Sequence, residues 1–235
     1  MRLSENLLQA ALFDLDGVIA PTAALHQQAW ASVLDRYLAA FPGQRPCSAE
    51  DYRRFIDGRR RENGIETFLR ARDLPVDCAT VDLIAEAKNT AFHALLDAGA
   101  IAPRPGVARF LEGLKADGVK CGLFTASRNA ARVLAAIGLG DAFGAVVDGN
   151  VAKAEGLASK PAPDLPLSCA RKLGAIPARC VLFEDAIAGI AAGRAGGFGR
   201  VVGVAEGSHA AALLEAGADT VIATFESLET GQVLG

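Results

Sequence analysis

Short apolar runs of strand length alternate with helix-like segments along the chain, and this alternation constrains the fold more than any other feature. Strands are expected at residues 8–15, 119–125, 145–147, 180–183, 201–204 and 220–223. Helices are expected at residues 106–116, 129–137, 163–173, 186–195 and 209–215. Continuous apolar runs are typical of strands buried on both faces, and strands that alternate with helices form a parallel sheet. The sequence therefore predicts an α/β fold.

One long segment, residues 21–96, breaks this alternation because it contains no convincing strand. Four helical patterns fill it, at residues 25–38, 48–56, 64–73 and 81–96. Ser48 followed by Asp51 is typical of a helix start. The proline-containing segment 100–106 then acts as a boundary. We predict a core domain made of residues 1–20 and 97–235, with an all-helical domain of residues 21–96 inserted into it.

Composition narrows the classes of partner. Apolar residues make up 51% of the 235 residues and charged residues 22%, which predicts a folded chain. A net charge of −3 provides no general attraction for nucleic acid or anionic membranes, so an anion must be bound locally. The five cysteines contain no CxxC pair, and neither a signal-peptide pattern nor an apolar stretch of membrane-spanning length is seen. We therefore expect a cytoplasmic protein that binds neither nucleic acid nor membranes.

The sharpest local feature is the pair Asp14 and Asp16 at the end of the first predicted strand. Residues i and i+2 of an extended chain share one side, so their carboxylates are brought together, and Gly17 allows the chain to turn away. Neighbouring like charges are costly unless a cation or proton separates them, and Mg²⁺ suits such oxygen ligands. The alternative is an ordinary strand exit with solvated aspartates.

Three further polar clusters follow other predicted strands, at the edge where open parallel sheets bind ligands. Thr125 to Asn129 places hydroxyls before a helix, which suits a phosphate cradle or a plain helix cap. Lys160 lies in a stiff loop with two prolines, where it suits a phosphoryl group or plain solvent. Glu184 and Asp185 add two carboxylates, or another cap.

Taken together, the motifs DLDGV, FTAS, KPAPD and FEDAIAG resemble, in order and spacing, the four motifs of the haloacid-dehalogenase-like phosphotransferases. The resemblance spans nearly the whole chain. It implies a three-layer, doubly wound parallel sheet with an inserted helical cap. It also implies phosphoryl transfer through an aspartyl phosphate, with one Mg²⁺ ion as cofactor.

The resemblance also implies roles for individual core residues. Asp14 corresponds to the nucleophile and Asp16 to the general acid and base. Thr125 and Lys160 correspond to the positions that hold the phosphoryl oxygens and complete the catalytic group. The implied metal ligands are Asp14, Asp16 through its main-chain carbonyl, Glu184 and Asp185.

The position of the insertion is similar to that in the β-phosphoglucomutase-like subgroup, and this likeness implies a set of substrate-binding residues. In the helical segment they are His26, Trp30, Gly58, Arg61 and Lys88, and in the core they are Ser127, Arg128 and Asn129. Blander alternatives exist, since His26 also suits a satisfied helix-face histidine and Arg59 to Arg61 a solvated charge run. Pro21 departs from the aspartate that the subgroup commonly has.

Two activities remain open for such a chain. A mutase acting on β-glucose 1-phosphate through the 1,6-bisphosphate would need a second anion site, which Arg61 and Lys88 can supply, and a sugar bisphosphate primer. The alternative is a phosphatase for a small phosphorylated sugar or metabolite. A dinucleotide-binding module is disfavoured because the glycines at 193–199 follow a helix instead of opening one. The chain is expected to act as a monomer.

Overall fold

The computed structural model describes residues 8–57, 59–99, 101–226 and 228. The chain divides into two compact units, which we call the core unit (Met1–Pro21 with Ala102–Gly235) and the helical unit (Thr22–Ile101). The boundaries lie one and five residues later than the predicted ones, after residues 20 and 96.

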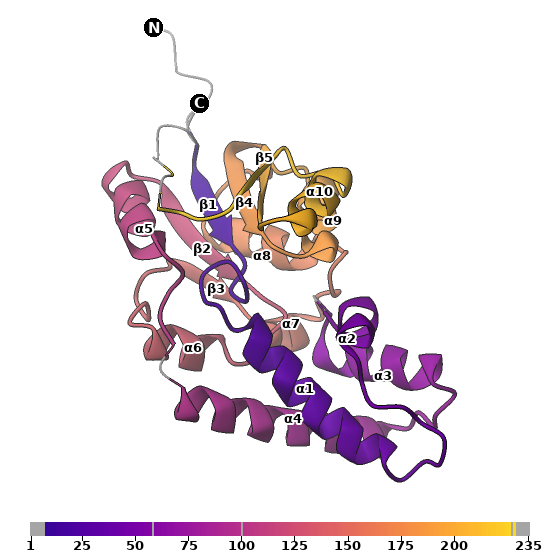
Figure 1. Ribbon diagram of the computed structural model, residues 1–235. Helices are drawn as coiled ribbons and strands as arrows, with labels where there is room; N and C mark the ends of the chain where they lie inside the picture. Colours follow the sequence, from indigo (N-terminus) through magenta and orange to yellow (C-terminus); the bar gives the residue numbers. More distant parts are fainter. Residues whose placement is uncertain (1–7, 58, 100, 227, 229–235) are drawn as a thin grey trace, which may run out of the picture. The chain divides into compact units, whose positions relative to one another are not determined.

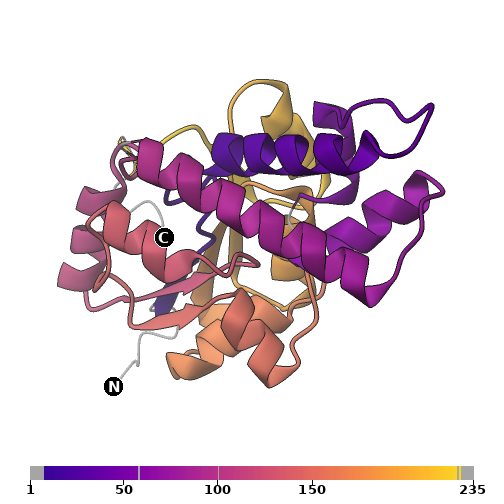
Figure 2. The same cartoon turned by 90° about the horizontal axis from the view of Figure 1, so that it is seen from below.

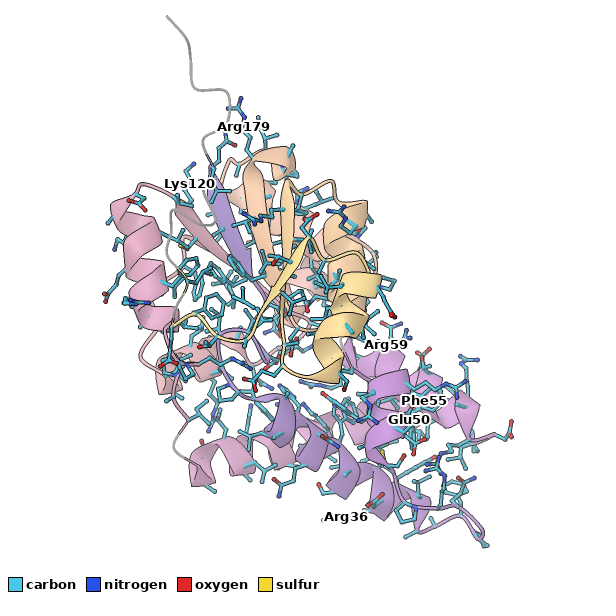
Figure 3. The ribbon with its side chains drawn as sticks, turned by 45° about the horizontal axis from the view of Figure 1, so that its top comes forward. Arg36, Glu50, Phe55, Arg59, Lys120 and Arg179 are labelled. Carbon is cyan, nitrogen blue, oxygen red and sulfur yellow. The ribbon has the colours of Figure 1, made fainter. Side chains whose placement is uncertain are left out.

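The core unit contains a six-stranded parallel sheet with the strand order β3-β2-β1-β4-β5-β6 (Figure 1). The strands are β1 (Ala10–Phe13), β2 (Lys120–Phe124), β3 (Ala145–Val147), β4 (Cys180–Glu184), β5 (Arg200–Val204) and β6 (Thr220–Ile222). All six lie where the apolar runs predict them. Lys120 and Arg179 mark the amino-terminal edge of the sheet (Figure 3), so the predicted catalytic motifs follow the opposite, carboxyl-terminal edge.

The helices of the core unit are α5 (Val107–Ala116), α6 (Ala130–Ala136), α7 (Gly149–Glu155), α8 (Asp164–Lys172), α9 (Ile187–Ala195) and α10 (Ser208–Glu215), with a 3-10 turn at Pro177–Arg179. Five of the six helices were predicted, and α7 was not. Asp148 caps α7 by accepting hydrogen bonds from the N–H groups of Asn150 and Val151, both at 2.9 Å. The sequence of α7, GNVAKAE, opens on Gly149 and Asn150 and has few apolar residues, so it shows no clear helical period.

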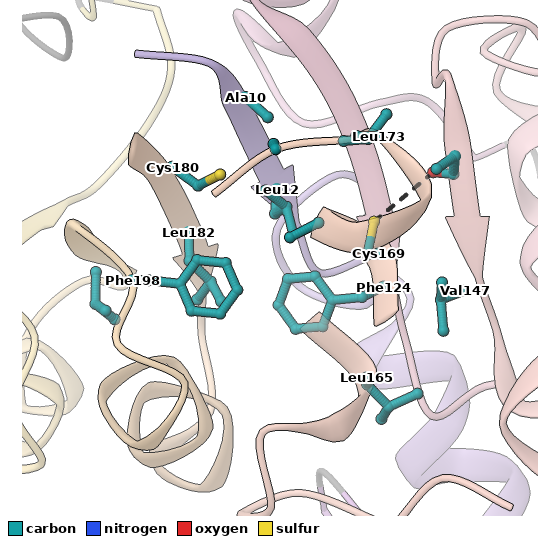
Figure 4. Packing of buried hydrophobic residues seen from close by; sticks show 14 of the residues in the cluster. Ala10, Leu12, Phe124, Val147, Leu165, Cys169, Leu173, Cys180, Leu182 and Phe198 are labelled. Atoms are coloured by element: carbon teal, nitrogen blue, oxygen red, sulfur yellow. Dashed lines mark hydrogen bonds between the residues drawn. The ribbon is translucent and has the colours of Figure 1, made fainter. Parts of the chain in front are cut away.

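Both faces of the sheet are covered. On one face, Leu12 and Phe124 pack in a buried cluster with Cys169 of α8 and Leu182 of β4 (Figure 4). Because side chains alternate along a strand, the next residue of β1, Phe13, lies on the other face. There its ring contacts those of Phe110, Phe183 and Phe225. The predicted three-layer α/β architecture is therefore confirmed.

The helical unit consists of α1 (Ala23–Leu38), α2 (Ala49–Phe55), α3 (Arg61–Ala71) and α4 (Cys78–Ala98), as the four helical patterns predict. Helices α1 and α4 lie side by side (Figures 1 and 2). The unit has its own apolar core, with Trp30, Leu34, Phe68 and Ile84 among its members. No helix of the described residues is long and apolar enough to cross a membrane.

Candidate active site

A buried lysine between two carboxylates lies at the carboxyl end of the central strands. Asp14 follows β1, where its N–H donates to the carbonyl oxygen of Phe183 at 3.0 Å. Lys160 Nζ lies 2.6 Å from Asp14 Oδ1 and also donates to Glu184 Oε1. All three residues are buried, with exposed fractions of 4% or less. We call Asp14, Lys160 and Glu184 the lysine cluster.

The lysine cluster holds more negative than positive charge. Burial raises the pKa of Asp14 well above its ordinary value, and the charges of Glu184 and Asp16 raise it further, while Lys160 opposes these effects. Burial alone would lower the pKa of Lys160, but the charges of Asp14 and Glu184 raise it above its ordinary value. The cluster therefore favours the charged form of Lys160 and disfavours the ionised form of Asp14.

Glu184 is fully buried and both of its carboxylate oxygens have partners. Oε1 accepts from Lys160, and Oε2 accepts from the N–H of Ala186 at 2.7 Å. The carboxylate also lies directly against Gly189 of α9, where a Cβ would collide with it. In this structure the carboxylate of Glu184 is hydrogen-bonded to Lys160 and to the N–H that precedes α9, and its role as a metal ligand stays a prediction.

The turn after Asp14 is held close to Asp185. Gly17 adopts a φ of +85°, and its N–H donates to the carbonyl oxygen of Ala20 at 2.8 Å. A Cβ added at Gly17 would collide with Oδ2 of Asp185, so the carboxylate of Asp185 lies over the glycine. Two predicted metal ligands, Asp16 in this turn and Asp185 after β4, are thereby brought to the same place.

The loop after β2 supplies the predicted hydroxyls. Thr125 is buried, and its Oγ1 donates to Asp16 Oδ2 across 3.5 Å while accepting from the N–H of Ser127 at 3.0 Å. Ser127 Oγ accepts from the N–H of Asn129 at 3.2 Å. The carbonyl oxygen of Arg128 accepts from Asn150 Nδ2 at 3.0 Å. The structure thus joins Thr125 to Asp16 and orders residues 125–129 through local hydrogen bonds.

In the helical unit, His26 and Lys88 form a buried pair. Lys88 Nζ lies 2.6 Å from His26 Nδ1, and the His26 ring stacks on Phe92 with ring centroids 4.1 Å apart. Lys88 Nζ also lies 5.4 Å from the centroid of the Trp30 ring. One hydrogen bond joins the two nitrogens, and the tautomer of His26 sets which of them donates.

Arg61 opens α3 and makes contacts on α4. Its Nη2 donates to Asn89 Oδ1 at 3.1 Å and its Nη1 to the carbonyl oxygen of Ala85 at 3.5 Å. The predicted residues His26, Trp30 and Lys88 thus meet in one cluster of the helical unit, and Arg61 meets Asn89 in another. Gly58 lies outside the described residues.

Sequence reasoning missed two side chains that hold the catalytic turns. Arg104 Nη1 donates to the carbonyl oxygen of Gly17 at 3.0 Å, and His209 Nε2 lies 2.6 Å from the carbonyl oxygen of Asp185. Both side chains contact main-chain carbonyl oxygens. Every residue has such an oxygen, so the sequence gives no sign of these contacts. The only signal for Arg104 was a lone arginine in the proline-containing boundary segment, and His209 gave none.

The predicted metal ligands do not form a complete site as they stand. Within the described ranges, no three His, Cys, Asp or Glu side chains lie close enough together to hold a metal ion. Asp14, Asp16 and Asp185 follow two adjacent strands, β1 and β4, whereas Glu184 is turned to Lys160.

Comparison with known proteins identifies the family. Residues 8–197 match the family described as haloacid dehalogenase-like hydrolase. The chain is 38% identical over 241 residues to β-phosphoglucomutase of Mycobacterium bovis, which covers 94% of this chain and 91% of that one. It is 33% identical over 195 residues to fructose-1-phosphate phosphatase YqaB of Escherichia coli, with 81% and 93% covered.

A solved structure shares the fold over nearly the full length. The crystal structure of β-phosphoglucomutase from Clostridium difficile superimposes with a TM-score of 0.83 and 27% identity, covering 97% of this chain and 96% of that one. Together with the family match, this likeness extends over both the parallel sheet and the inserted helices. The chain belongs to the haloacid dehalogenase-like hydrolase family and, within it, to the β-phosphoglucomutase-like enzymes of phosphoryl transfer or phosphate-ester hydrolysis.

Proposed function

We propose that this enzyme is a Mg²⁺-dependent β-phosphoglucomutase, which converts β-glucose 1-phosphate into glucose 6-phosphate through the 1,6-bisphosphate. Asp14 attacks the phosphorus atom of the bisphosphate, and the bond from phosphorus to the sugar oxygen breaks. The phosphoryl group then passes from Asp14 to the other hydroxyl of a bound monophosphate. A sugar bisphosphate primer is needed to load Asp14 first.

The observation that carries phosphoryl transfer, the step common to both candidate activities, is the lysine cluster, and the 38% identity to a β-phosphoglucomutase favours the mutase. Lys160 Nζ donates to Asp14 Oδ1 at 2.6 Å, and it also donates to Glu184, which helps to hold the ammonium in place. A fixed, buried cation beside the reacting group stabilises the negative charge that spreads over a transferring phosphoryl group.

Asp16 supports the same chemistry as the general acid and base. It is partly exposed, unlike Asp14, and lies two residues further along the turn. It can therefore protonate the leaving sugar oxygen and accept a proton from the attacking hydroxyl. Thr125 Oγ1 donates to the Asp16 carboxylate at 3.5 Å in this structure, and with a substrate bound its single proton would turn to a phosphoryl oxygen instead.

The donor set fits Mg²⁺, a hard cation that prefers oxygen ligands. Asp14, Asp185 and the main-chain carbonyl of Asp16 would hold it, and its charge would offset the surplus of carboxylates that raises the pKa of Asp14. When bound, the ion neutralises charge on the phosphoryl oxygens. Glu184 contributes indirectly, through its contact with Lys160.

The helical unit offers donors for the second phosphate and for the sugar. Arg61 presents a planar guanidinium, a group that can bind a phosphate through two nitrogens, and its contacts include Asn89 Oδ1 and the carbonyl oxygen of Ala85. His26 and Lys88, whose nitrogens lie 2.6 Å apart, add polar groups suited to binding sugar oxygens. A substrate with phosphate at both ends explains why a phosphotransferase would carry these groups on its inserted helices.

A phosphatase for a small sugar phosphate is the second candidate. The likeness to fructose-1-phosphate phosphatase YqaB, at 33% identity, favours it. The two activities differ in what attacks the phosphorylated Asp14: a sugar hydroxyl in the mutase and water in the phosphatase. The chemistry at Asp14 and Lys160 is common to both.

The deciding experiment supplies the enzyme with Mg²⁺, β-glucose 1-phosphate and a trace of β-glucose 1,6-bisphosphate, and measures glucose 6-phosphate and inorganic phosphate together. We expect glucose 6-phosphate to form much faster than inorganic phosphate, and only slowly without the primer. Release of inorganic phosphate at a comparable rate would replace the mutase by the phosphatase. Absence of both products with this and other sugar phosphates would contradict phosphoryl transfer.

A matched pair of variants on α3 tests the second phosphate site. Arg61→Ala should reduce mutase turnover by about 100-fold, because a charged hydrogen bond to phosphate is lost, while hydrolysis of p-nitrophenyl phosphate changes little. Arg70→Ala is the control, since Arg70 lies on the same helix in an exposed ion pair with Glu66 at 3.7 Å. Equal losses in both assays would show that Arg61 binds no second phosphate.

A further inference from the structure

Arg104 joins three segments of the core unit through hydrogen bonds to main-chain oxygens. Its Nη1 donates to Gly17 at 3.0 Å, its Nη2 to Ala223 at 3.1 Å, and its own N–H to Ile19 at 2.8 Å. Gly17 and Ile19 belong to the turn that carries Asp16, Arg104 lies in the segment that returns from the helical unit, and Ala223 follows β6.

We propose that Arg104 is a positioning residue that fixes the Gly17 turn, and through it Asp16 and Asp185, for phosphoryl transfer. This inference rests on the proposed function for its catalytic readout. The structural claim is that the guanidinium of Arg104 holds the turn in one conformation. The hydrogen bonds alone support that claim. Arg104 touches neither of the two aspartates and acts only through the backbone of the turn.

The Gly17 peptide is the point at which a shift would matter. Within the turn, Gly17 N–H donates to Ala20, and the N–H groups of Ile19 and Ala20 donate to Leu15. The carbonyl oxygen of Gly17 points out of this pattern and is held by Arg104. Glycine rotates easily about its backbone bonds, so this outside contact restricts it. Any rotation would also disturb Asp185, whose carboxylate lies directly over the same residue.

The far end of the Arg104 contact is itself firmly held. Phe225, two residues after Ala223, is fully buried among the rings of Phe13, Phe110 and Phe183. Gly106 lies so close to the backbone of Phe225 that a Cβ there would collide with it. Thr224 Oγ1 also donates to the carbonyl oxygen of Pro105 at 3.2 Å. Arg104 therefore fastens the catalytic turn to a rigid part of the core unit.

The shape of a guanidinium suits this task. One planar group must donate from two nitrogens to two carbonyl oxygens that belong to segments about 200 residues apart in sequence, Gly17 and Ala223. Lysine carries a single nitrogen on a flexible stem and cannot span both oxygens with the same geometry. Arg104→Lys should therefore behave more like Arg104→Ala than like the parent.

The test compares Arg104→Ala and Arg104→Lys with Arg109→Ala. Arg109 is the matched control because its guanidinium donates to the carbonyl oxygen of Glu226, in the same C-terminal segment, without touching the catalytic turn. We expect Arg104→Ala to lower kcat by about 10- to 100-fold, because misplaced catalytic groups cost rate even when all are present. The Mg²⁺ concentration for half-maximal activity should rise, and millimolar guanidinium should restore part of kcat. Arg109→Ala should retain the parent values.

A second measurement is independent of catalysis. Hydrogen exchange of the amides of residues 16–20 should become about tenfold faster in Arg104→Ala and stay unchanged in Arg109→Ala, because only the first variant frees the turn. Unchanged exchange, or kcat equal to that of Arg109→Ala, would overturn the assignment. If the parent enzyme transfers no phosphoryl group, the proposed function fails, and the exchange experiment still decides whether Arg104 holds the turn.

Discussion

The two units each bury a carboxylate in a network of charges, but with opposite balance. In the core unit, two carboxylates, Asp14 and Glu184, share the single ammonium of Lys160. In the helical unit, the single carboxylate of Asp51 is shared by two guanidinium groups. Arg45 binds it with two nitrogens, at 2.6 and 2.9 Å, and Arg72 Nη2 lies 2.8 Å from Oδ2. We call the second group the arginine cluster.

The balance of charge moves the two aspartate pKa values in opposite directions. The pKa of Asp14 is raised by burial and by neighbouring carboxylates. Burial also acts to raise the pKa of Asp51, but hydrogen bonds from Arg45, Ser48 and Arg72 hold it well below its usual range. The arginine cluster satisfies its carboxylate completely, as expected of a structural contact. The lysine cluster leaves a deficit of positive charge, which a bound cation would offset.

The largest effect should come from breaking the lysine cluster at its nucleophile. Asp14→Asn removes the attacking carboxylate, so turnover should fall by about 10⁴-fold or more in both the mutase and the phosphatase assay. The melting temperature should not fall, because the variant also removes a buried negative charge from a cluster that has too many. Calorimetry and steady-state kinetics on one preparation measure both. A variant within tenfold of the parent rate would refute the assignment of Asp14.

Removing the cation of the lysine cluster should have the next largest effect. Lys160→Met keeps an apolar stem of similar length, and we expect turnover to fall by about 10²- to 10³-fold, the usual effect of losing one fixed electrostatic contact to the transition state. Lys172→Met is the matched control, since Lys172 is half-exposed and pairs with Glu155 at 2.7 Å. If both variants lost the same activity, Lys160 would have no special part in the reaction.

The contrast between the clusters also explains what the sequence could predict. Strands buried on both faces leave continuous apolar runs, so β1 to β6 were predictable. Asp14 and Thr125 were recognisable because each directly follows such a run, and Lys160 because it lies in the motif KPAPD. Ser48 and Asp51 were correctly predicted to start a helix, since their spacing defines a capping box. The sequence did not predict which side chains form hydrogen bonds and ion pairs with one another.

Many of these hydrogen bonds and ion pairs join residues that are far apart in sequence, so no local sequence pattern predicts them. Asp51 gave no sign of its two arginines, because Arg72 lies 21 residues away in sequence. Glu184 was grouped with Asp185 as a metal ligand, since two adjacent carboxylates look alike in a sequence. The fold separates them: Glu184 is packed against Gly189 and Lys160, whereas Asp185 lies over Gly17. Arg104 and His209 bind main-chain oxygens, which carry no residue preference at all.

Breaking the arginine cluster should affect stability and leave the chemistry of Asp14 unchanged. Asp51→Ala leaves the buried guanidinium of Arg72 without its counter-ion and removes the half of the capping box in which Asp51 accepts from the N–H of Ser48, so the free energy of unfolding of the helical unit should fall by about 3 kcal/mol. Trp30, the only tryptophan, lies in the core of that unit, so its fluorescence during urea unfolding reports on it directly. A shift no larger than that of an exposed ion pair would contradict the structural role.

The stability that Asp51 contributes should depend on pH in a definite direction. The pKa of Asp51 is lower in the folded protein than its ordinary value of 3.8, so folding favours the charged form. Its contribution is complete above pH 3.8 and is lost as the pH falls below that value towards the lower folded pKa. The difference in urea midpoint between the parent and Asp51→Ala should therefore be constant from pH 8 to about pH 5 and become smaller towards pH 3. A difference that grew on acidification would be inconsistent with a charged Asp51.

The smallest effect on stability should come from removing Arg45, the more exposed arginine of the arginine cluster. Arg45 and Arg72 contact the same carboxylate at similar distances, but the Arg45 side chain is 62% exposed and that of Arg72 only 9%. Water and salt screen an exposed ion pair, and holding its long side chain costs conformational entropy. Arg45→Ala should therefore shift the urea midpoint of Trp30 fluorescence far less than Arg72→Ala, and the shift should vanish in 0.5 M salt. Equal shifts would mean that contact distance, and not burial, sets the strength of this cluster, and the contrast with the fully buried Lys160 would then lose its physical basis.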